Sequence, residues 1–236
     1  MSKMNMDEMI MVSVDDHLIE PADMFIGRMP QAYADSTPRV GRFANGDERW
    51  IVEGKPWGGI GTAAVAGRRR EELGNEPTHY GDVRLGTWQV DARVDDMNAN
   101  GTLASLNFAK LPGFAGEKLV GGKDKALMLA IIQAYNDWHI EEWVGAHPGR
   151  FIANAILPLW DIDLAIAELR RVGARGCGSS HFRKTRPRSI CPPSTGGIGT
   201  GCSPKSSNVV SRSRFTSVPR EASYRPHHLN RRRMWA

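Results

Sequence analysis

The alternation of apolar and polar segments between Met9 and Gly176 limits the chain to a small set of folds. Short apolar runs typical of buried strands alternate with segments in which apolar residues recur at helical spacing. Strands are predicted at Met9–Val14, Thr102–Phe108 and Phe151–Pro158, helices at Val90–Asn98, Lys123–Ala146 and Asp161–Val172, and the start of a fourth strand at Ala174–Gly176. Three strand–helix units in a row, without an antiparallel pattern, predict a parallel α/β sheet.

The stretch between the first strand and the first helix has a different character. It is polar and rich in glycine from Pro30 to about Trp88. Within it, Arg49–Lys55 predicts a small hairpin that turns near Gly54.

A parallel sheet of this kind is either doubly wound or part of a (β/α)8 barrel. The first strand runs into Asp15-Asp16-His17 rather than a glycine-rich phosphate loop, which favours the barrel. A whole barrel takes about 250 residues, and the strand–helix pattern stops after three and a half units. We therefore expect an incomplete barrel of three to four parallel strands, formed by residues 1–176.

Asp15 and His17 are candidate metal ligands. They lie two positions apart at a strand end, so their side chains leave the strand on the same face. A carboxylate and an imidazole together form half of a site for a divalent ion such as zinc or manganese. The alternative is that Asp15 or Asp16 caps the next turn and His17 is a hydrogen-bonded surface residue. Glu20 is either a second-shell or substrate-facing acid, or a solvated loop acid.

The remaining candidates favour structural roles. We predict His139 and His147 to be surface residues and Trp138 and Trp143 to be core residues. Arg68–Arg70 is followed by two glutamates, which indicates a solvated loop.

Four ordered segments resemble the amidohydrolase-related family, the decarboxylase-like branch of the metal-dependent hydrolases. They read VSVDDHLIEPADMF, RVDDMNANGTLASLNFAKLPGFAG, AYNDWHIEEW and HPGRFIANAILPLWDIDLAIAELRRVGARG, and they cover nearly all of residues 9–176. The resemblance implies a (β/α)8 barrel whose metal is held by a pair on the first strand, a histidine from a middle strand and a late aspartate. The first-strand pair would be Asp15 and His17, where the family often has His-x-His or Glu-x-His.

The same resemblance implies a homo-oligomeric enzyme that hydrolyses or non-oxidatively decarboxylates a small organic substrate. The N-terminal residues lack the pattern of a signal peptide, and the sequence contains no apolar run of 18 residues. A cytoplasmic location without membrane contact is therefore expected. The further metal ligands have no counterpart here, because His181, His227 and His228 stand in no strand-like context. The chain is therefore expected to be a truncated, inactive copy that binds metal weakly or not at all.

Residues 177–236 differ in composition from the rest of the chain. They contain 12 of the 31 lysines and arginines, a single acid (Glu221) of the 26, and all three cysteines. So few aliphatic side chains predict a disordered, basic tail. Cys177, Cys191 and Cys202 have neither the number of a disulfide framework nor the spacing of a zinc site.

Codon degeneracy offers an origin for this tail. If the codons from Gly176 onward are read one base late, they permit the amino-acid sequence V-R-V-V-A-F-P-E-N. Further on they permit L-H-I-G-S, a strand that ends in the metal-binding histidine that the resemblance implies and the present chain lacks. In each shifted codon the degeneracy of the genetic code leaves one base open, and the amino-acid sequence determines the other two. The agreement extends over some forty positions. We therefore expect residues 177–236 to be out of frame; a natural basic tail is the alternative.

A second class of function would use the tail as it stands. Its basic residues could bind nucleic acid or an anionic surface through phosphates: Arg183, Lys184, Arg186, Arg188, Arg212, Arg214 and Arg231–Arg233. No stacking aromatics are interleaved with them, so no specific nucleic-acid partner is expected.

Overall fold

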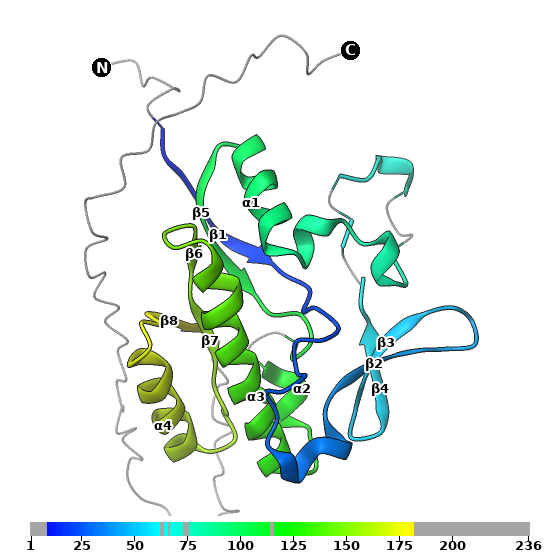
Figure 1. The fold of residues 1–236 in the computed structure, drawn as a ribbon, viewed down its shortest axis with the longest axis vertical. Coiled ribbons are helices and arrows are strands. Elements are labelled where there is room, and N and C mark those ends of the chain that lie inside the picture. The colour runs from blue at the N-terminus through cyan, green and yellow to red at the C-terminus, as the bar shows by residue number, and fades with distance from the viewer. Residues whose placement is uncertain (1–8, 62–63, 66, 73–75, 114–115, 182–236) are drawn as a thin grey trace, which may run out of the picture. The chain divides into compact units, whose positions relative to one another are not determined.

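Residues 9–61, 64–65, 67–72, 76–113 and 116–181 are described by a computed structural model (Figure 1). They form a mixed α/β structure with parallel strands, as the sequence predicts. The prediction of a disordered tail from residue 177 is wrong for its first five residues, because Cys177 is buried and Ser179–His181 form a strand. Residues 182–236, with most of the predicted change of reading frame, lie outside this description. None of the helices in these ranges is long and apolar enough to cross a membrane.

Parallel strands form the centre of the structure. Three of them pair in the order β1-β5-β6, and β7 pairs with β8. Their bounds are β1 Met11–His17, β5 Thr102–Phe108, β6 Phe151–Ile152, β7 Asn154–Ile156 and β8 Ser179–His181. The pairing aligns Asp16 with Asn107 and His17 with Phe108, so β1 and β5 end at the same edge.

Two strand predictions need correction. The run Phe151–Pro158 forms two short strands, β6 and β7, that are separated by Ala153. The fourth strand begins at Ser179 rather than at Ala174–Gly176, because Ala174 caps the preceding helix and Gly176 turns the chain at a φ of 86°.

The helices follow the predicted order. Their bounds are α1 Val90–Ala99, α2 Glu117–Val120, α3 Lys125–Trp138, the π-helical η7 His139–Val144 and α4 Ile162–Gly173. Single 3-10 turns lie at η3 Arg70–Glu72, η4 Tyr80–Asp82 and η5 Leu85–Thr87, and η2 Gln31–Ser36 is a 3-10 segment with a kink at Tyr33. α3 and α4 begin at aspartates, Asp124 and Asp161, whose carboxylates accept two backbone amides each.

A small antiparallel sheet occupies the glycine-rich stretch. Strands β2 (Arg39–Arg42), β3 (Glu48–Val52) and β4 (Lys55–Gly59) pair in sequence order. The predicted hairpin is confirmed, with Glu53 and Gly54 at positive φ in its turn. The expectation that the chain lacks an antiparallel sheet is wrong, because β2 adds a third strand whose own sequence, Arg-Val-Gly-Arg, carries little strand signal.

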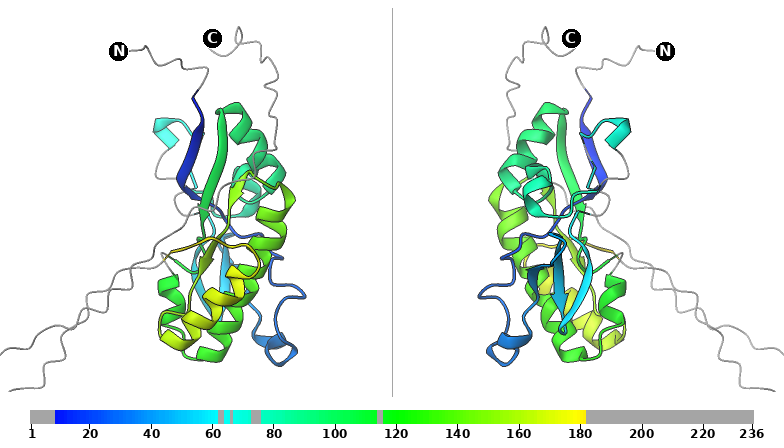
Figure 2. Two further views of the ribbon diagram at one scale, coloured as in Figure 1. Left: turned by 90° about the vertical axis from the view of Figure 1, so that its left-hand side faces the viewer. Right: turned by 90° about the vertical axis from the view of Figure 1, so that its right-hand side faces the viewer.

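The core lies between the parallel strands and the helices. α1 and α3 lie on the same side of β1 and β5 (Figure 2). Trp138 and Trp143 are buried there, as predicted, together with Tyr135, Met128 and Ile132.

The prediction that the first strand is buried is wrong. Met11, Val12 and Val14 are exposed. Among the described residues β1 pairs only with β5, so its outer edge and much of its surface have no cover.

Candidate functional site

Asp15 and His17 lie side by side at the carboxyl end of β1. Asp15 Oδ1 and His17 Nε2 are 3.9 Å apart, and the two side chains are 86% and 66% exposed. The imidazole ring also contacts the ring of Phe108 on the neighbouring strand, with centroids 5.6 Å apart. The two residues thus share one face of the strand, and Asp16 points elsewhere.

The Asp16 carboxylate joins a polar chain that runs along β5. It accepts a hydrogen bond from the Ser105 hydroxyl. The Asn107 amide donates to the same hydroxyl at 3.1 Å, and Trp143 Nε1 donates to Asn107 Oδ1 at 3.0 Å. Ser105 and Asn107 are fully buried. Sequence reasoning missed both, although two polar residues inside T-L-A-S-L-N-F were a usable signal.

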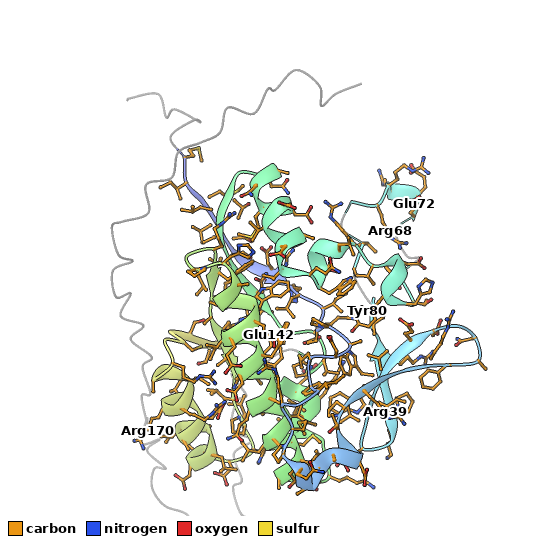
Figure 3. The ribbon with its side chains drawn as sticks, viewed as in Figure 1. Arg39, Arg68, Glu72, Tyr80, Glu142 and Arg170 are labelled. Carbon is orange, nitrogen blue, oxygen red and sulfur yellow. The ribbon has the colours of Figure 1, made fainter. Side chains whose placement is uncertain are left out.

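Glu20 is buried two positions beyond the buried Leu18, at the same edge of the sheet. Its carboxylate accepts the backbone amides of Lys110 at 2.8 Å and Leu111 at 2.9 Å. The Tyr80 hydroxyl donates to the Glu20 backbone oxygen at 2.5 Å, and Figure 3 labels this tyrosine. Glu20 is therefore not a solvated loop acid: it fastens the segment after β1 to the segment after β5.

Burial shifts the pKa values of Glu20 and Lys110. It raises the pKa of Glu20 to about 7, against the lowering effect of the amides that it accepts. It also lowers the pKa of Lys110 to about 8. The Lys110 ammonium donates to the backbone oxygens of Gly59, at 2.6 Å, and Ile60. Glu20 and Lys110 line a cavity of about 10 Å³, room for roughly one water.

The donor set of Asp15 and His17 fits a divalent ion. Two ligand atoms that are each about 2.1 Å from a tetrahedral ion lie about 3.4 Å apart, so the 3.9 Å between Asp15 Oδ1 and His17 Nε2 would have to shorten slightly on binding. Among the described residues no group of three or more histidines, cysteines, aspartates or glutamates is placed to hold a metal. Asp15 and His17 are thus two side chains that could hold a metal, without a third beside them in the described part of the chain.

His139 and His147 lie away from this pair. The prediction of a surface His139 is wrong: the ring is buried and stacks on Tyr135, with centroids 5.7 Å apart and planes 11° from parallel. His139 directly follows α3, and its side chain is buried on the side of the helix that packs against the core. His147 is half-exposed, as predicted, and its Nε2 lies 2.7 Å from Asp91 Oδ1.

Comparisons with known proteins identify the fold. No family model matches the chain, and no curated protein does. A solved amidohydrolase from Mycobacterium avium subsp. paratuberculosis K-10 matches 73% of this chain, with a TM-score of 0.57 and 19% sequence identity. The chain spans about half the length of that protein, since the match covers 49% of it. The described residues therefore have an amidohydrolase-like fold.

Proposed function

We propose that the chain carries the first part of a metal-dependent enzyme of the amidohydrolase-related family. One observation carries the proposal: the Asp15–His17 pair stands at the carboxyl end of β1 in a fold that resembles a solved amidohydrolase. In (β/α)8 barrels the chemistry takes place at the carboxyl ends of the strands. The parallel strands would then be the first four of an incomplete barrel.

Asp15 and His17 would hold a zinc or manganese ion. When bound, such an ion supplies a Lewis acid that activates water for hydrolysis or binds the carboxylate of a substrate that is to be decarboxylated. The hydrogen bond from Ser105 to Asp16 supports β1 beneath the pair. Glu20 holds the segment after β5 in place through the Lys110 and Leu111 amides. The substrate would be a small organic molecule.

Two ligands are one fewer than the three that a catalytic zinc site normally takes from the protein. We therefore infer that this chain is an inactive copy whose reading frame changes near Gly176. An intact relative would be a cytoplasmic homo-oligomer. The competing function, binding of nucleic acid or an anionic surface, depends on basic residues from Arg183 onward, which lie outside the described residues.

Zinc titration of the purified chain tests the metal site. We expect micromolar or weaker affinity that disappears in His17→Ala and in Asp15→Ala. The control is His147→Ala, which removes a half-exposed histidine that is paired with Asp91 and should leave zinc binding unchanged. Binding that survives His17→Ala would reject the assignment, and sub-micromolar affinity would mean that the site is more complete than two ligands.

A further inference from the structure

The outer edge of β1 is an exposed, apolar strand edge. β1 ends the strand order β1-β5-β6, and no other described strand pairs with it. Met11, Val12 and Val14 are 48%, 43% and 65% exposed. An edge of this kind, with unpaired backbone groups and large apolar side chains, readily accepts another strand.

The opposite end of the parallel strands is also incomplete. β8 pairs with β7 on one side, and no described strand pairs with its other side. α4, the helix that leads into β8, exposes Ile162, Ile166 and Leu169 by 72%, 39% and 46%. These residues are four and three positions apart, so they form one apolar stripe on the helix surface.

The number of parallel strands indicates what covers the exposed edges of β1 and β8. β1, β5, the consecutive β6 and β7, and β8 provide four parallel positions. A closed barrel of strand–helix units has eight, and the chain spans 49% of the solved amidohydrolase. A rotation of one copy by 180° about an axis parallel to the strands places its β1 beside β8 of the other copy. The same rotation places its β8 beside β1 of the other copy, so the two contacts are equivalent. Such a rotation closes after two copies and preserves the parallel direction.

We propose that two copies of this chain associate through the edges of β1 and β8, giving eight parallel strands in one closed assembly. Each copy then covers the exposed edge of the other. Both Asp15–His17 pairs lie on the same rim, on opposite sides of the assembly and four strands apart, so each remains a separate pair of ligands. The association itself requires no metal, and its failure would leave the proposed metal pair untouched.

Sedimentation of the full chain in the presence of a chelator, over a range of concentrations, tests the association. We expect a dimer of twice 26.1 kDa. Val14→Lys should weaken it at least tenfold, because a lysine ammonium on the β1 edge would have to be desolvated. The matched control is Ile26→Lys, since Ile26 is 76% exposed but lies in the turn beyond Glu20. Circular dichroism and the fluorescence of the buried Trp138 and Trp143 verify that each variant is folded.

Hydrogen exchange locates the contact. In the dimer the backbone amides between Val12 and Val14 that point away from β5 should gain protection, and Val14→Lys should remove that gain. A monomer at every concentration overturns the proposal, as does a series of larger oligomers, because an open series means that the rotation does not close. Protection of the same amides in a monomer would mean that another part of the same chain covers the β1 edge, and it would also overturn the proposal.

Discussion

A single buried carboxylate makes the stability of the fold depend on pH. The pKa of Glu20 is about 7 in the folded protein, against an ordinary value of 4.5, because burial disfavours the charged form. Between pH 4.5 and 7 the folded state holds a proton that the unfolded state has released. The free energy of unfolding therefore falls as pH rises through this window, by on the order of 3 kcal/mol. Denaturant titrations from pH 4.5 to 7.5 should show this loss, and Glu20→Gln should remove it.

The exposed Asp15 provides the control for that experiment. Asp15→Asn changes a carboxylate that is 86% exposed and should keep the pH dependence of the parent. Lys110 titrates in a separate window: its lowered pKa of about 8 makes the free energy of unfolding rise between pH 8 and 10.5. A Glu20→Gln variant that still loses stability between pH 4.5 and 7 would show that another group is responsible.

Glu168 is a second buried carboxylate, and it stays ionised. Burial raises its pKa, but hydrogen bonds from Arg171, at 2.8 Å, and Asn136, at 2.7 Å, outweigh that effect and bring the pKa below its usual value. Arg171→Met should therefore cost about 3–5 kcal/mol of unfolding free energy, because the charge at Glu168 loses its partner. Arg170→Met is the matched control, since Arg170 lies on the outer side of α4 (Figure 3). Equal effects of the two substitutions on denaturant midpoints would contradict this account.

How far single residues could be predicted depends on whether their environment is local. The proximity of Asp15 and His17 follows from the two-residue period of a strand, and the structure brings them together. The burial of Glu20 depends on the amides of Lys110 and Leu111, some ninety positions away, which no local pattern reveals. His139 was misplaced for a related reason, since the burial of its ring depends on what packs against the end of α3.

At the scale of elements, the turn between β3 and β4 depends on a glycine. Gly54 has a φ of 70°, which L side chains rarely adopt, and open space surrounds the position of its missing Cβ. Gly54→Ala should therefore cost about 1 kcal/mol through backbone strain alone. Gly58→Ala is the control, since Gly58 also faces open space but lacks a positive φ. Thermal melts of both variants compare the costs, and equal melting temperatures would rule out strain at the turn.

Elements with their own sequence signals were predicted well. β5 occupies the predicted Thr102–Phe108, and α4 begins at the predicted cap Asp161. The errors concern elements that are defined by their neighbours. β2 exists because β3 pairs with it, and β1 is exposed because strand order places it at an edge. A pattern of apolar residues shows that a segment can be buried, but not that the described chain supplies what buries it.

At the scale of the whole molecule, the decisive question is what should follow Gly176. If one base is missing near the codons of Arg175 to Cys177, inserting it should replace residues 177–236 with strand, helix and strand, and continue to a full barrel. The repaired protein would gain the histidine of L-H-I-G-S as a third ligand beside Asp15 and His17. Three protein ligands are the usual number for catalytic zinc, so zinc affinity should rise from micromolar or weaker to sub-micromolar.

Sequencing the gene, inserting the base and titrating both proteins with zinc checks this prediction. His17→Ala in the repaired protein is the matched variant, and it should return the affinity to that of the present chain. Metal-dependent hydrolase or decarboxylase activity should appear only after repair, because two ligands hold the ion too weakly to keep it in place through a reaction. An absence of open reading frame beyond the Gly176 codon in the shifted frame would defeat the account, and the basic segment would then be a natural extension of the fold.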